Sequence, residues 1–125
     1  MTISLLTNYP DTFKVGVAGG PVIDWKWYEV MYGERYMDTP ETNPEGFAAV
    51  SLVDKAPLLK ARLLICQGME DATVLPMHSM SFMQSCVEHN ILPDYFPYPR
   101  SEHNVLGPWR EQLYLKITDH FDSWL

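Results

Sequence analysis

Basic residues are scarce in this chain, and long apolar runs are absent. Nine Lys and Arg residues stand against 16 Asp and Glu residues, which gives a net charge of -7 with no basic stripe. Because phosphate binding needs clustered positive charge, we expect no nucleic-acid partner. No run of about 18 apolar residues occurs, so we expect no membrane span. With 46% hydrophobic residues in a length of 125, the chain is still apolar enough to form one modest folded domain.

Cysteine is rarer still, with Cys66 and Cys86 as the only two. One lies in an apolar strand-like run and the other in a helix-like stretch, which favours two buried free thiols over a disulfide. The histidines His78, His89 and His120 have no ligand spacing to one another or to the cysteines. We therefore expect no metal site and no cofactor.

Two motifs are also missing. No Gly-x-Ser-x-Gly occurs, which is the motif that presents the nucleophilic serine in many hydrolases. The opening residues 1–6 have neither a basic start nor a small-residue cleavage site, so we expect no signal peptide in this stretch.

Three short apolar runs predict strands, at residues 13–18, 62–66 and 94–98. Pro97 places the last of them at an edge or a strand end, since proline cannot donate to a ladder. Helix-like segments separate the runs, and this alternation predicts an α/β fold with a mostly parallel sheet.

The helices are predicted from apolar spacing and from proline positions. We expect a short amphipathic helix at the start of the chain, one helix over 25–37, a loop over 39–46 and a connector with a helical turn over 53–60. The last two helices are predicted after Pro76, with Met80, Met83 and Val87 on one face, and at the end of the chain, with Leu113, Ile117, Phe121 and Trp124 on one face.

Polar and aromatic residues follow each predicted strand. Asp71 ends the turn after the second strand, His103 follows the third, and Val22 and Trp25 follow the first. Functional groups of parallel sheets gather beyond the carboxyl ends of the strands, so we expect these residues to converge. In α/β-hydrolases the triad acid precedes the triad histidine along the chain; the histidine moves the proton and the acid orients its ring.

A longer pattern surrounds these residues. The stretch 9–22, with its Gly-Gly-Pro, and the aromatic stretch 25–37 resemble the catalytic domain of the dipeptidyl peptidase IV and prolyl tripeptidyl peptidase group of the prolyl oligopeptidase family. The resemblance covers nearly all of residues 1–125 and implies the C-terminal portion of an α/β-hydrolase domain. The nucleophile elbow and the propeller are absent from this stretch. Met1-Thr2 resembles the end of the elbow, so the serine is expected just upstream.

The resemblance also implies roles for individual residues. Asp71 matches the triad acid and His103 the triad base, whereas Thr73 stands where some relatives have an asparagine that contacts the substrate backbone. The apolar pocket for proline matches Tyr28, Tyr32, Trp25, Val22 and Val74.

The implied function is a serine exopeptidase that releases dipeptides or tripeptides after proline. Its partners would be peptides with a proline near the N-terminus, and the resemblance implies a homo-oligomer formed through the C-terminal region. A periplasmic or secreted parent is compatible with it.

Two alternatives remain open. Because no serine elbow is present, the chain could be a catalytically inactive truncated domain or an interaction module. Within the enzymes, the alternative is an acyl-peptide hydrolase or an esterase-type serine hydrolase, against which the tyrosine-bearing stretch argues. An in-frame Gly-Trp-Ser-x-Gly-Gly upstream of Met1 would distinguish an enzyme part from the first alternative.

Overall fold

A three-stranded parallel sheet forms the centre of the structure, a computed structural model that describes all 125 residues. The strand order is β1-β2-β3, with β1 at Val15–Gly19, β2 at Arg62–Gly68 and β3 at Asp94–Tyr98. Each neighbouring pair is parallel and matched over five residues. The predicted α/β fold with a parallel sheet is therefore confirmed, with strand ends shifted by one or two residues.

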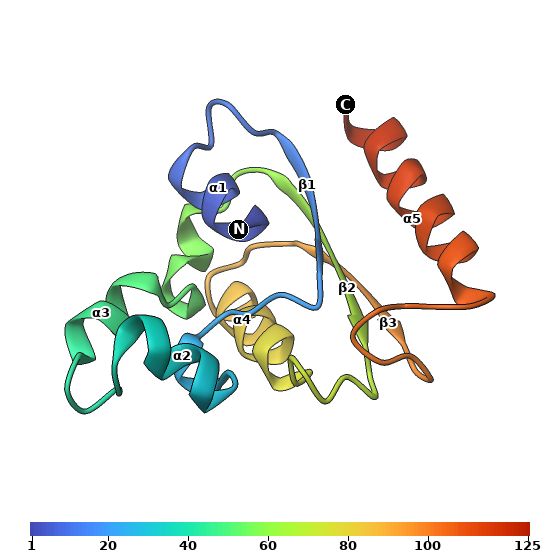
Figure 1. Cartoon of the computed structure of the whole chain (residues 1–125). Helices are drawn as coiled ribbons and strands as arrows, with labels where there is room; N and C mark the ends of the chain where they lie inside the picture. The colour runs from blue at the N-terminus through green and yellow to red at the C-terminus, as the bar shows by residue number, and fades with distance from the viewer.

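Helices cover both faces of this sheet (Figure 1). α1 (Thr2–Asn8) and α4 (Met77–Glu88) lie on one face, and α5 (Trp109–Trp124) lies on the other. Neighbouring residues of a strand point to opposite faces, so Leu63 joins the larger core on the first face and Leu64 the smaller core on the second. These helices confirm the three predicted at the start, after Pro76 and at the end of the chain. No helix is both long and apolar enough to cross a bilayer.

The face of α4 that carries Met80, Met83 and Val87 is mostly not the one that packs inward. Met80 and Val87 are exposed and Met83 packs against the core only in part, whereas the buried face carries Phe82 together with polar His78 and Ser79. These two polar side chains can be buried because each finds a hydrogen-bond partner on another element.

The predicted stripe of α5 is correct over its first three residues, which are half-buried above the sheet. Trp124 instead is 44% exposed, and the Arg62 guanidinium lies 3.9 Å from its ring centroid. His120, for which no role was predicted, is buried in its place and approaches the Arg62 carbonyl with Nε2 at 3.3 Å.

The single helix predicted over 25–37 is also wrong, because the structure divides it. A 3-10 turn, η1 (Trp25–Trp27), is followed by extended backbone at Tyr28, and α2 (Val30–Met37) begins afresh. The break follows from Glu29, whose carboxylate accepts the backbone N–H groups of Met31 and Tyr32 and so caps α2.

The loop predicted over 39–46 contains the start of another helix, α3 (Pro44–Val50). Pro44 suits the first turn of a helix, and the Asn43 side chain caps it by accepting the N–H of Gly46 at 3.1 Å. The predicted connector is confirmed as η2 (Val53–Leu58), a 3-10 segment that leads into β2.

Candidate active site

Asp71 and His103 meet beyond the carboxyl ends of β2 and β3. Nδ1 of His103 lies 2.7 Å from Oδ2 of Asp71, so the two side chains form a hydrogen bond. The side chain of Asp71 is completely buried, whereas that of His103 is 36% exposed. The pair therefore has a shielded acid behind an imidazole that substrate or solvent can reach.

The turn after β2 fixes the carboxylate of Asp71. Oδ1 accepts the backbone N–H groups of Thr73 at 2.9 Å and Val74 at 2.8 Å. This arrangement, typical of an Asp that closes its own turn, leaves Oδ2 directed at His103. The Thr73 side chain itself is exposed, and its backbone is what holds the acid.

Gln67, near the end of β2, donates a hydrogen bond to the same carboxylate. Its amide nitrogen lies 3.3 Å from Oδ2 of Asp71 and 3.0 Å from the carbonyl of Gly68, and its amide oxygen accepts the Ser79 hydroxyl at 2.8 Å. Gln67 and Ser79 are both fully buried. Sequence reasoning did not identify Gln67, although a lone amide at the end of an otherwise apolar strand is a usable signal.

Two glycines allow the segments of the site to approach one another. Gly20 has φ +48°, and a Cβ there would lie 3.0 Å from Nδ1 of His103 and 3.1 Å from Oδ2 of Asp71. A Cβ on Gly68 would collide with the backbone carbonyl of Glu102. A larger residue at either position would therefore separate the acid from the base.

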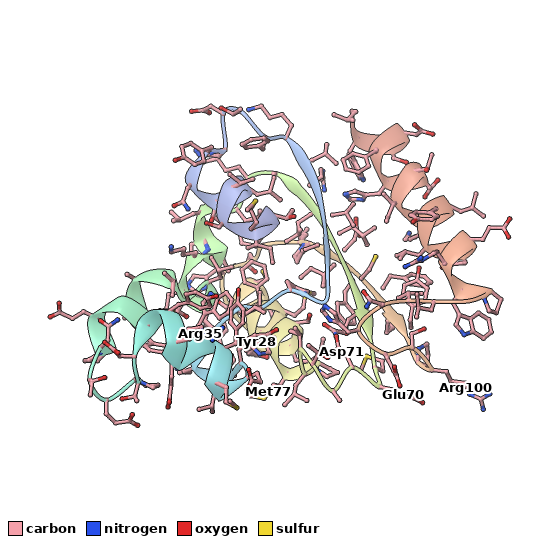
Figure 2. All side chains as sticks on the ribbon, in the orientation of Figure 1. Tyr28, Arg35, Glu70, Asp71, Met77 and Arg100 are labelled. Atoms are coloured by element: carbon pink, nitrogen blue, oxygen red, sulfur yellow. The ribbon has the colours of Figure 1, made fainter.

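A hollow of about 740 Å³ opens beside His103. Val22, Trp25, Tyr28 and Val74 line it together with His103. Figure 2 shows Tyr28 and Asp71 at the same end of the sheet, with Tyr28 nearer the helices and Asp71 nearer the ends of the strands. Four of the five residues predicted for the apolar pocket thus surround one space next to the histidine.

Tyr32 is the predicted pocket residue that does not line this hollow. Its ring stacks on Trp25, with centroids 5.7 Å apart and planes 15° apart, and also packs against the rings of Tyr28 and Tyr36. Tyr28 meets Trp25 edge-on at 5.3 Å. The aromatic rings therefore form a cluster in which Tyr32 supports the wall of the hollow from behind.

His78, on α4, is fully buried where this helix packs against the loop that carries Val22. Its Nδ1 accepts the N–H of Ile23 at 3.0 Å and that of Asp24 at 3.4 Å, while its Nε2 has no hydrogen-bond partner. Burial lowers the pKa of His78, and the Trp27 carbonyl and the carboxylates of Asp24 and Asp71 oppose this less strongly. The ring is therefore neutral at pH 7, with Nδ1 as the acceptor.

The thiols take no part in this chemistry. Cys66 and Cys86 are free and buried, as predicted, and burial raises the pKa of each to about 11. A protonated, inaccessible thiol is not a nucleophile. The imidazole of His103 is instead partly exposed and placed so that its Nε2 could accept a proton from a nearby hydroxyl.

Known proteins share this arrangement of the chain. The prolyl oligopeptidase family matches residues 1–125. A "Probable dipeptidyl-aminopeptidase B" from Aspergillus oryzae is 33% identical over 128 residues, which covers 100% of this chain and 14% of that protein. The chain therefore spans about a seventh of the length of this curated relative.

Two solved structures resemble it closely. The crystal structure of a "putative dipeptidyl aminopeptidase IV" from Bacteroides ovatus is 54% identical with a TM-score of 0.98, covering 100% of this chain and 18% of that one. Dipeptidyl peptidase 4 from Porphyromonas gingivalis is 34% identical with a TM-score of 0.95, covering 98% and 18%.

Proposed function

We propose, because this chain belongs to the prolyl oligopeptidase family, that it supplies the acid, the base and the substrate pocket of a serine peptidase. Its fold matches the C-terminal part of the α/β-hydrolase domain of dipeptidyl peptidase IV-like proteins. The observation that carries the proposal is the 2.7 Å hydrogen bond between His103 and Asp71 at the edge of a hollow whose wall includes Val22, Trp25, Tyr28 and Val74.

In this proposal His103 transfers the proton. Its Nε2 accepts the proton of a serine hydroxyl as the serine oxygen bonds to the carbonyl carbon of the substrate, and it later gives that proton to the leaving amine as the C–N bond breaks. Asp71 keeps the other proton on Nδ1 and stabilises the imidazolium that forms in between. Water then releases the acyl group by the same steps.

The serine would come from a segment that precedes Met1. Met1, which directly precedes α1, and Ser4 within α1 line the same hollow as His103. A chain that enters α1 from upstream would therefore pass beside the base, which supports this origin of the nucleophile.

The proposed substrate is a peptide with proline at the bond to be cut. Val22, Trp25, Tyr28 and Val74 offer an apolar, aromatic surface to a rigid apolar ring. Burying a side chain of that size is worth about 1.5–3 kcal/mol, which is enough to select it over alanine. Tyr32 would act through Trp25, on which it stacks.

The test begins with the reading frame upstream of the Met1 codon. We expect it to encode a serine elbow, and the extended protein to release p-nitroaniline from glycyl-prolyl-p-nitroanilide until a fluorophosphonate blocks it. The 125-residue chain alone should show no turnover, because a triad without its nucleophile retains little activity. An extended protein that lacks the serine, or ignores prolyl substrates, would refute the proposal.

A further inference from the structure

His78 is a buried histidine that the proposed proton transfer does not use. It is the second residue of α4, and it contacts a segment that precedes it by 55 positions. That segment, residues 20–24, joins β1 to η1 and has no helix or strand of its own. Its backbone N–H groups therefore need partners from elsewhere in the molecule.

Nδ1 of His78 is the acceptor for two of these groups, the N–H of Ile23 at 3.0 Å and that of Asp24 at 3.4 Å. Val22, immediately before them, and Trp25, immediately after them, both line the 740 Å³ hollow. The hydrogen bonds of His78 thus fasten the backbone between the two wall residues.

The other nitrogen of the ring shows why a histidine is informative here. Nε2 is buried without a partner, and an unpaired buried donor is unfavourable. A leucine of similar size would avoid this penalty and would still fill the space. What His78 supplies, and an apolar residue could not, is the acceptor at Nδ1.

We propose that His78 is a positioning residue that sets the wall of the substrate pocket by holding the Ile23–Asp24 backbone against α4. This inference rests on the proposed peptidase function. The turn that carries Asp71 and Val74 leads directly into α4, so His78 also fixes the wall relative to the acid.

Two substitutions separate an acceptor from a space-filling residue. In His78→Asn the amide oxygen takes about the position of Nδ1, so the acceptor for the loop N–H groups is kept. In His78→Leu the volume and apolar character remain, and the acceptor is lost. Ser79→Ala is the matched control, because Ser79 is the next residue, is equally buried and bonds Gln67 instead of the loop.

The first measurement is hydrolysis of glycyl-prolyl-p-nitroanilide by the extended protein. We expect His78→Leu to raise KM about tenfold and to change kcat less than about threefold, and His78→Asn to keep both within about threefold. Ser79→Ala should act on kcat through Gln67 and Asp71 and leave KM within about threefold. The reverse order, with leucine tolerated and asparagine impaired, would show that His78 only fills space.

The second measurement needs no activity. Hydrogen exchange of the extended protein, read by mass spectrometry on peptides covering residues 20–27, should be faster in His78→Leu and unchanged in His78→Asn. If exchange follows this order while the wild type fails to cleave prolyl substrates, the positioning role of His78 is supported and the peptidase proposal is refuted. If His78→Leu exchanges like the wild type, the positioning role of His78 is itself refuted.

Discussion

Gly20 is a residue at which the backbone passes close to both the acid and the base. Its φ is +48°, and a Cβ there would lie 3.0 Å from Nδ1 of His103. We expect Gly20→Ala to lower the free energy of unfolding by about 1–2 kcal/mol, since the left-handed region is unfavourable for any residue with a side chain. Urea unfolding measures this. Gly19→Ala is the control, because no atom lies within 4 Å of its Cβ position. Equal effects at the two positions would contradict the account.

His78 makes stability depend on pH in a defined direction. Burial lowers its pKa below the ordinary 6.5, so the unfolded chain binds the proton more readily than the folded one. This contribution to stability is complete above pH 6.5 and is lost as pH falls through the folded pKa, with the carboxylates of Asp24 and Asp71 opposing the shift. We expect urea midpoints of the wild type to fall more steeply below pH 6.5 than those of His78→Asn. Identical slopes would show that His78 does not titrate in this way.

The meeting of Asp71 and His103 was predictable, because polar residues that follow neighbouring parallel strands must gather at one edge. The supporting residues were not predictable in this way. His78 acts on a backbone 55 positions away, and Gly20 matters because two other segments pass beside it. Among these supporting residues, only Gln67 has a signal in the sequence, because it is an amide at the end of an apolar strand.

At the scale of elements, the end of β2 and the loop after β3 are in direct backbone contact. A Cβ on Gly68 would collide with the carbonyls of Ser101 and Glu102, which cannot move aside as a side chain could. We expect Gly68→Ala to be among the strongly destabilising substitutions, by about 3 kcal/mol or more, because overpacking here displaces backbone.

The control for that substitution lies within a helix. Gly33 is buried in α2, and its nearest neighbour would be the Trp25 carbonyl at an ordinary 3.9 Å. Gly33→Ala should be neutral or stabilise by about 0.5–1 kcal/mol, because glycine costs entropy inside a helix. Thermal unfolding measures the stability of both variants. A similar loss of stability in each would refute the close backbone contact between the end of β2 and the loop after β3.

The elements that were predicted correctly carry a local signal. Apolar runs marked the three strands, and apolar spacing marked the last helix. The errors in where helices begin and end lie between residues 25 and 50, where capping decided the outcome. The carboxylate of Glu29 and the amide of Asn43 each begin a new helix, and they override the tyrosine spacing and the prolines on which the prediction relied.

At the scale of the whole molecule, β1 pairs with β2 alone and forms one edge of the sheet. An exposed edge offers unpaired backbone groups to another chain. We expect the 125-residue chain to associate through β1, giving a mass above 14.4 kDa by light scattering at micromolar to millimolar concentrations.

A variant on α5 distinguishes this contact from a second surface. Leu115 is 64% exposed on α5, the helix that covers the opposite face of the sheet from α1 (Figure 1). Leu115→Glu should leave the mass unchanged if β1 is the contact, and would lower it if α5 were. A folded monomer throughout the concentration range would show that the edge is closed by the chain itself.

The most direct test of the account is the kcat of Asp71→Asn in the extended protein, measured on glycyl-prolyl-p-nitroanilide. Asparagine preserves the shape of the turn but removes the charge that holds the His103 tautomer, so we expect kcat to fall about a thousand- to ten-thousand-fold. KM should change little, because other residues line the hollow. Glu70→Gln, at the exposed neighbouring position, should retain normal kcat (Figure 2). An Asp71→Asn protein that keeps kcat within tenfold of the wild type would contradict the assignment of Asp71 and His103 as the acid and base.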